Sequence, residues 1–351
     1  MRLNYNGGVI MELERIGFYN FFEKQTLQDG KGRVAAVYKD RYKIYYNNGI
    51  SLMEIRGKML LEKEFPAVGD WVEIDDKNNI INSIYMPKTK MSRKSAGKRY
   101  EEQIIVSNID YIFIITSLNS DFNISRLERY LTIVYESGAI PVFILTKLDI
   151  AEEIEEKIEE LEKISFGVPI HKVSSLKNEG INELKKYFIG NKTVAVVGSS
   201  GVGKSTLINK LIGEEIIKTM EIREKDEKGK HTTTVREFYI LQEGVIIDTP
   251  GMREIALWNS DISNSFEDIE ELSKTCRFKN CTHETEPGCA VKEAVENGII
   301  SEKRVDNYKK MKREQQFIDD KKNFSLKQAE KNKVKNMMGS LNARKIIKKK
   351  I

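Results

Sequence analysis

The segment from Gly198 to Ser205 constrains the fold more than any other part of this sequence. It fits the pattern G-x-x-x-x-G-K-[ST], whose glycines let backbone N–H groups converge on phosphate oxygens. An apolar run precedes it and an amphipathic stretch follows, so it lies between a predicted buried strand and a predicted helix. The pattern therefore predicts an α/β domain with a phosphate-binding loop made of Gly198, Ser199, Ser200, Gly201, Val202, Gly203, Lys204 and Ser205.

Magnesium and the outer phosphates are expected close to this loop. Lys204 is expected to reach the β- and γ-phosphates of a nucleotide, and the Ser205 hydroxyl to bind magnesium. Thr206 is included in the predicted nucleotide contacts. Farther along the chain, Asp248-Thr249-Pro250-Gly251 follows another apolar run. Asp248 suits a carboxylate that acts on magnesium through water, and the Gly251 N–H is expected to approach the γ-phosphate.

The segment Lys228-Gly229-Lys230-His231-Thr232-Thr233-Thr234 lies between these two motifs. A threonine here can ligate magnesium when a triphosphate is bound, and Thr233 is the predicted ligand, although the pattern does not distinguish the three. The position that holds a water-orienting glutamine in Ras-like enzymes is occupied by Met252. His231 is therefore the predicted catalytic residue, and an ordinary exposed loop histidine is the alternative.

A guanine site is indicated by Thr146-Lys147-Leu148-Asp149, at the end of the apolar run 142–145. The segment is similar to N-K-x-D, with threonine in place of asparagine. The Asp149 carboxylate can accept from guanine N1–H and from the exocyclic amine, a donor pair that adenine lacks. The stem of Lys147 can cover the base. Ser174 and Ser175 follow another predicted strand, and their N–H groups are expected near guanine O6.

The base motif precedes the phosphate loop, which reverses the usual order of a GTPase. The same parallel sheet can still form, because the termini of many domains lie close together. We therefore expect a circularly permuted P-loop GTPase domain over residues 104–257, built from alternating strands and helices. Within it, Ser125 and Glu128 are predicted to form a capping box for a helix that ends near Ser137.

Residues 1–88 are predicted to hold a small β-barrel. Five short segments rich in β-branched and aromatic residues are separated by turn clusters, at 33–38, 42–46, 50–55, 71–74 and 80–85. An OB-fold is the leading interpretation, although the pattern does not distinguish it from an SH3-like barrel. Residues 89–103 form a basic linker, which either contacts phosphates or serves as a plain tether.

The C-terminal part, 258–351, is predicted to be a zinc-binding domain with a basic helical tail. Cys276, Cys281, His283 and Cys289 offer four N/S ligands, which suits one closed, structural zinc site; three reduced cysteines in a loop are the alternative. From Lys303 onward there are 17 Lys or Arg against 5 Asp or Glu. This excess indicates either a polyanionic partner or a solvated, charged helix.

These motifs resemble the ribosome small-subunit-dependent GTPase A family, circularly permuted GTPases of ribosome assembly. The segments that carry the resemblance are G-x-x-G-V-G-K-S-T at 198–206, G-K-H-T-T-T at 229–234, D-T-P-G-M-R-E at 248–254 and C-R-F-x-x-C-x-H-x-x-x-P-G-C-A-V at 276–291. Thr146 and Met53 depart from residues common in the family. The resemblance implies hydrolysis of GTP to GDP and phosphate, stimulated by the small ribosomal subunit late in its maturation.

The expected partners are GTP or GDP, the small ribosomal subunit and its rRNA, for a cytoplasmic monomer. No apolar run approaches the roughly 18 residues of a membrane span. Two other functions remain open at this point. One is an RNA-binding assembly module for which GTP or GDP is only a conformational ligand. The other is an RNA-directed ATPase, which Asp149 argues against.

Overall fold

The computed structural model describes residues 2–3, 9–10, 12–25, 30–94, 102–119, 121–215, 236–249, 261–321, 323–324 and 327. The chain divides into two compact units. One comprises Met1–Ser92 and Ile104–Ile255, and the other comprises Arg93–Gln103 and Ala256–Ile351. Among the described residues, no helix combines the length and the apolar character that crossing a membrane requires.

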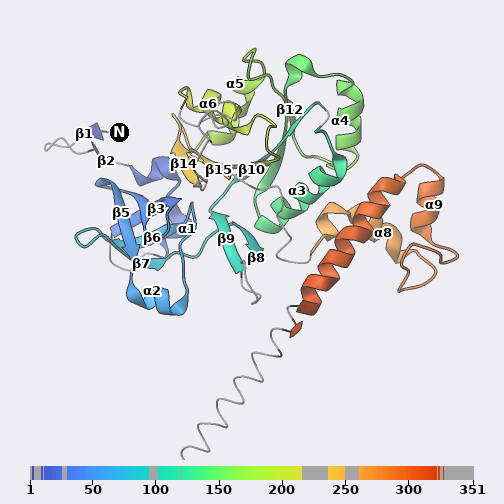
Figure 1. The fold of residues 1–351 in the computed structure, drawn as a ribbon, viewed down its shortest axis with the longest axis horizontal. Helices are drawn as coiled ribbons and strands as arrows, with labels where there is room; N and C mark the ends of the chain where they lie inside the picture. The colour runs from blue at the N-terminus through green and yellow to red at the C-terminus, as the bar shows by residue number, and fades with distance from the viewer. Residues whose placement is uncertain are drawn as a thin grey trace, which may run out of the picture. The chain divides into compact units, whose positions relative to one another are not determined.

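The first unit contains a five-stranded barrel (Figure 1). Its elements are β3 (Gly30–Val37), β4 (Tyr42–Tyr46), β5 (Gly49–Ile55), α2 (Gly57–Glu62), β6 (Trp71–Asp75) and β7 (Ile80–Ile84). The strand order is β3-β4-β5-β7-β6, with β5 and β7 parallel, and β6 closes the barrel onto β3. This closed order agrees with the predicted OB-fold, and all five predicted strands are present. Short elements precede the barrel: β1 (Arg2–Leu3), β2 (Val9–Ile10), η1 (Leu13–Ile16) and α1 (Asn20–Glu23).

The α/β domain of the same unit has the strand order of a P-loop GTPase. Its strands are β12 (Ile170–Lys172), β11 (Ile140–Thr146), β10 (Tyr111–Ser117), β13 (Thr193–Gly198), β15 (Val245–Asp248) and β14 (Glu237–Ile240), in that spatial order. All neighbours are parallel except β14, which runs antiparallel to β15. The late strand β13 therefore lies between the early strand β10 and the last parallel strand β15, which confirms the predicted permutation.

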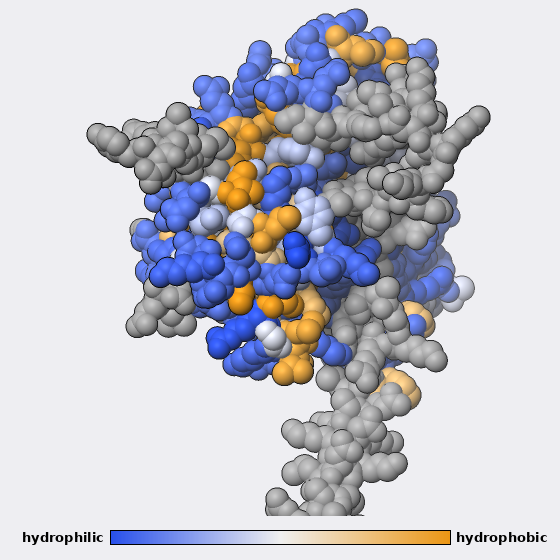
Figure 2. Space-filling view, turned by 60° about the vertical axis from the view of Figure 1, so that its left-hand side comes forward, coloured by the Kyte–Doolittle hydropathy of each residue, from blue (hydrophilic) through white to orange (hydrophobic). Residues whose placement is uncertain are grey.

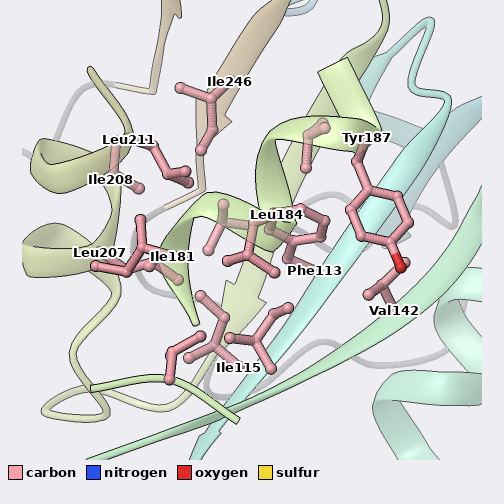
Figure 3. Packing of buried hydrophobic residues seen from close by; sticks show 14 of the residues in the cluster. Phe113, Ile115, Val142, Ile181, Leu184, Tyr187, Leu207, Ile208, Leu211 and Ile246 are labelled. Carbon is pink, nitrogen blue, oxygen red and sulfur yellow. The ribbon is translucent and has the colours of Figure 1, made fainter. Parts of the chain in front are cut away.

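Helices cover both faces of this sheet. They are α3 (Ile124–Ser137), η2 (Leu148–Ile150), α4 (Ile154–Glu162), α5 (Ile181–Leu184), η3 (Lys185–Phe188) and α6 (Lys204–Ile212). Figure 3 shows side chains of α5, η3 and α6 packed on strand residues such as Phe113, Ile115 and Ile246. The alternate residues Ile112 and Ile114 are also fully buried, because strand side chains alternate between the two faces and α3 contacts β10 and β11.

Helix α3 begins earlier than its predicted capping box. Asn123 has extended backbone angles (φ −150°, ψ 107°), and its side-chain oxygen accepts a hydrogen bond from the Arg126 N–H at 2.9 Å. Asn123 is therefore the N-cap, and the predicted Ser125–Glu128 capping box is wrong, because both residues already lie inside the helix. The helix ends at Ser137, as predicted.

The barrel and the α/β domain share one sheet of 11 strands. Strand β14 pairs with β3 through Glu237 and Ala36. The Lys43 ammonium lies 2.6 Å from the Glu237 carboxylate, and the rings of Tyr45 and Phe238 stack with centroids 5.1 Å apart. The strand that follows the predicted switch segment is therefore joined directly to the barrel.

A buried arginine fills this joint. The guanidinium of Arg33, which is 1% exposed, lies 5.6 Å from the ring centroids of Trp71 and Phe238. It donates to three backbone carbonyls, those of Ile16, Gly69 and Asn108. Burial lowers the pKa of Arg33 to about 10, so the side chain stays charged at neutral pH. One cation therefore ties together the N-terminal segment, the barrel and the chain entering β10.

The predicted basic linker contains regular structure. Strand β8 (Lys90–Lys94) pairs with β9 (Glu102–Ser107), although residues 95–101 lie outside the described part of the chain. In the second unit the further elements are η5 (Ser263–Ser265), α8 (Glu267–Lys274), α9 (Ala290–Glu296) and a helix over residues 302–321. That last helix buries Val305, Tyr308 and Met311, so these side chains are packed against the protein. The end of the predicted tail, 328–351, lies outside the described residues.

Candidate nucleotide site and metal centre

The predicted phosphate loop joins β13 to α6, as a strand–turn–helix must. Gly198 has φ +151°, and a Cβ built there would lie 2.3 Å from the Ile115 carbonyl oxygen, so no side chain fits. Gly203, just before α6, is left-handed at φ +94°. These two glycines allow the chain to leave the sheet and enter the helix with its first N–H groups free to face an anion.

The Lys204 side chain lies over the first residues of the phosphate loop. Its ammonium donates to the Gly198 carbonyl at 2.8 Å and to the Ser199 carbonyl. Ser205 and Thr206 occupy the first turn of α6, beside it. A cation and a helix N-terminus are thus concentrated at one end of β13, where they favour phosphate oxygens.

The base motif contacts the phosphate loop directly through Thr146. Its hydroxyl donates to the Val202 carbonyl at 2.5 Å and lies 3.2 Å from the Thr116 carbonyl. Thr146 is only 3% exposed, and Lys147, which follows it, is left-handed at φ +60°. This contact brings the two predicted halves of the site together across 56 residues of sequence.

Asp149 and Ser174 also come together. The Ser174 hydroxyl donates to the Asp149 carboxylate at 2.6 Å, which holds the pKa of that carboxyl below its usual value. Leu148 donates its N–H to the Val173 carbonyl at 3.2 Å, so the base motif and the segment with Ser175 are held side by side. An ionised, positioned carboxylate is the acceptor that guanine N1–H and its exocyclic amine require.

Asp248 ends β15, and its register partner on β13 is Val196, two residues before the phosphate loop begins. It is 8% exposed, and the next residue, Thr249, donates its hydroxyl to the Val196 carbonyl. The predicted magnesium carboxylate therefore lies one strand from the loop that carries Ser205. His231, Thr233 and Gly251 lie outside the described residues, so their predicted roles stay predictions.

The structure brings one further side chain to the loop. Arg126, in the first turn of α3, contacts the Ser199 hydroxyl. This contact was not predictable from the sequence, because a charged residue near a helix start is usually solvated and its partner lies 73 residues away.

In the second unit the four predicted metal ligands converge. Their ligand atoms all lie within 4.8 Å of one another. The Cys276 and Cys289 sulfurs are 3.9 Å apart, and the His283 Nδ1 lies 3.8 and 3.3 Å from them. Ligands of a tetrahedral zinc are separated by about 3.8 Å, since each lies roughly 2.3 Å from the ion. Cys281 completes the group, and the Cys3His set can hold one metal ion.

The imidazole of His283 is prepared to act as a ligand. Its Nδ1 faces the sulfurs, while its Nε2 lies 3.1 Å from the Ser273 hydroxyl. Burial, helped by the nearby Lys312 ammonium, lowers the pKa of His283, so the ring is neutral at pH 7. A neutral ring hydrogen-bonded through Nε2 leaves Nδ1 available to a metal.

Comparison with known proteins places these features in one family. A family model described as RsgA GTPase matches residues 84–258. The small ribosomal subunit biogenesis GTPase RsgA 1 of Listeria innocua serovar 6a is 44% identical over 339 residues, covering 94% of this chain and 97% of the relative. RsgA 2 of Lactiplantibacillus plantarum is 41% identical, covering 92% and 93%.

Solved structures agree with this comparison. YjeQ from Thermotoga maritima is 28% identical, covers 82% of this chain and 98% of its own, and gives a TM-score of 0.60. YloQ, described as a circularly permuted GTPase, is 23% identical, covers 84% and 96%, and gives a TM-score of 0.57. The latter likeness concerns the fold alone.

Proposed function

Because this chain belongs to the RsgA GTPase family, we propose that it binds the small ribosomal subunit and hydrolyses GTP to GDP and phosphate during late maturation of that subunit. It is a GTP-hydrolysing enzyme of the P-loop type. The observation that carries the proposal is the contact of Thr146 with Val202, which holds the base motif against the phosphate loop. One nucleotide can then be held by both.

In this proposal each part of GTP that must be recognised has a residue that binds it. Asp149 accepts from the guanine N1–H and amine, Lys147 covers the ring, and Ser174 and Ser175 supply N–H groups to O6. The amides of residues 198–206 and the Lys204 ammonium hold the phosphates. The proposed magnesium ligands, direct or through water, are Ser205, Thr233 and Asp248, and the Gly251 N–H faces the γ-phosphate.

We assign water orientation to His231, since Met252 offers no hydrogen bond. His231→Ala is expected to lower subunit-stimulated turnover about 100-fold, in the usual range for a general base, while GDP affinity stays unchanged. Stimulated turnover measured at saturating GTP decides the point. A variant that turns over like the unsubstituted protein would remove His231 from the mechanism.

The metal of the Cys3His group is proposed to be a single structural zinc. All four positions of a tetrahedral ion would be filled by protein atoms, which leaves no site for a reacting water. The second unit has a small core around α8, α9 and the 302–321 helix, and a metal would stabilise the loop that connects α8 to α9.

Contacts with rRNA are proposed for the barrel, the basic segment 89–103, the zinc module and the C-terminal tail. Figure 2 shows a largely hydrophilic surface on which apolar side chains are interspersed. Exposed barrel residues include the basic Arg41 and Lys58 and the aromatic Tyr38. Such a mixture suits phosphate contacts with base stacking. We propose the domain bounds 1–88, 89–103, 104–257 and 258–351, and a cytoplasmic monomer.

GTP turnover with purified ribosomal subunits tests the proposal. Hydrolysis is expected to be slow alone, to accelerate with small but not large subunits, and to disappear in Lys204→Ala. ATP should not substitute for GTP. If small subunits bound in a nucleotide-dependent way but never raised turnover, GTP would act on the subunit only as a conformational ligand, and the proposal of subunit-stimulated hydrolysis would be overturned.

A further inference from the structure

Arg126 reaches the phosphate loop from the half of the domain that carries the base motif. We propose that Arg126 is a positioning residue, which sets the conformation of the phosphate loop by holding the Ser199 hydroxyl. This inference rests on the phosphate site proposed above. The guanidinium Nη1 donates to Ser199 Oγ, the side chain of the second residue of the loop. Ser199 is only 4% exposed, whereas the Arg126 side chain is 34% exposed, so water reaches this contact only from the arginine side.

The guanidinium is also held by Asp121. Nη1 lies 2.9 Å from the Asp121 carboxylate, and Nη2 donates to the Asp121 carbonyl at 3.1 Å. The backbone of Arg126 is fixed as well, because its N–H donates to the Asn123 N-cap. A forked cation anchored in this way is a rigid brace and not a mobile finger, since leaving would break all three contacts.

Lys204 holds Ser199 at a second atom. Ser199, which receives the Arg126 contact on its hydroxyl, also accepts from the Lys204 ammonium on its carbonyl. The loop is thus held at two points by the preceding half of the domain, at Ser199 by Arg126 and at Val202 by Thr146. A loop fixed before the ligand arrives loses less conformational entropy on binding, and affinity rises accordingly.

The expected consequence is a change in binding without a change in chemistry. Because Arg126 acts on the loop and not on the transferred phosphoryl group, its loss should weaken GDP and GTP equally. Arg126→Ala is expected to raise both dissociation constants about tenfold, as the loss of one charge-assisted hydrogen bond would. The kcat with small subunits at saturating GTP should stay within about twofold.

Titrations of the full chain with fluorescent methylanthraniloyl-GDP and -GTP test this. Ser199→Ala, which removes only the hydroxyl, should weaken binding like Arg126→Ala, and the double variant should be no weaker than either single one. Lys163→Ala removes an equal charge from an exposed position of the same domain and serves as the control with wild-type affinity. Ser199→Ala also keeps the test decisive if Arg126→Ala fails to fold.

Three results would overturn the inference. The first is wild-type nucleotide affinity in both single variants. The second is a double variant whose dissociation constant rises by the product of the two single effects. The third is a fall in kcat while nucleotide affinity is retained. Lys204→Ala separates this inference from the proposed function. If Lys204→Ala also bound GDP normally, the phosphate site itself would be misplaced; if it lost GDP while Arg126→Ala and Ser199→Ala did not, the brace alone would fail.

Discussion

Replacing the buried Arg33 by methionine should destabilise the joint between the barrel and the α/β domain. Methionine keeps most of the side-chain volume between Trp71 and Phe238, but it leaves the buried carbonyls of Ile16 and Asn108 without their donor, whereas the Gly69 carbonyl still accepts from the Asn108 Nδ2. At about 3 kcal/mol for each fully buried, unsatisfied group, the loss is about 6 kcal/mol. Burial lowers the pKa of the Arg33 guanidinium to about 10, so removing this charged group returns about 3 kcal/mol. The net loss of unfolding free energy is therefore about 3 kcal/mol.

Urea unfolding, followed by tryptophan fluorescence, measures this loss. The chain has two tryptophans, so Trp258→Phe in every protein makes Trp71 the only reporter, and Trp71 is fully buried beside Arg33. Arg41→Met is the control, because Arg41 is 59% exposed and its ion pair with Glu54 contributes at most about 1 kcal/mol. If Arg33→Met lay within about 1 kcal/mol of its parent, the carbonyls would have other partners and the assigned role of Arg33 would be refuted.

Two further predictions concern the sites. Thr146→Val keeps the shape but leaves the Val202 carbonyl without its donor, and should weaken GDP binding about tenfold in fluorescence titration, whereas Thr146→Ser should bind normally. Equal GDP affinity of the Val and Ser variants would contradict the role of the Thr146 hydroxyl in holding the phosphate loop. Chelation should release one zinc per chain and lower the melting temperature of the second unit while GDP binding persists. Cys289→Ala should have the same effect as chelation. Folded protein that mass spectrometry shows to be free of zinc would rule out the metal.

The motifs were predictable because each is defined by local sequence. Gly198 and Lys204 are six residues apart, the turn they form depends on backbone geometry, and the metal ligands follow each other within one loop. The permutation was predictable from motif order alone, since parallel strands place their ends along one edge of the sheet.

Residues whose partners are distant in sequence were not predictable. Arg33 stands in a predicted strand, where an arginine ordinarily faces solvent, and its acceptors come from three separate segments. Arg126 is similar, because its partner Ser199 belongs to a motif that is complete without it. The strand β8 was missed because its lysines and arginine indicate a solvated linker. The cap of α3 was misplaced because Asn123 and Ser125 are both good capping residues, and only the backbone angles decide between them.

The shared sheet also fixes the order in which a newly made chain can become functional. Lys43 and Glu237 are 194 residues apart, so the barrel leaves the ribosome long before its neighbouring strand β14 exists. During that interval the end of β3 at Ala36 lacks its partner on β14, and β10 lacks its partner β13. The nucleotide site is complete only after the polypeptide has been synthesised through Asp248, so nucleotide binds late in the synthesis of the chain.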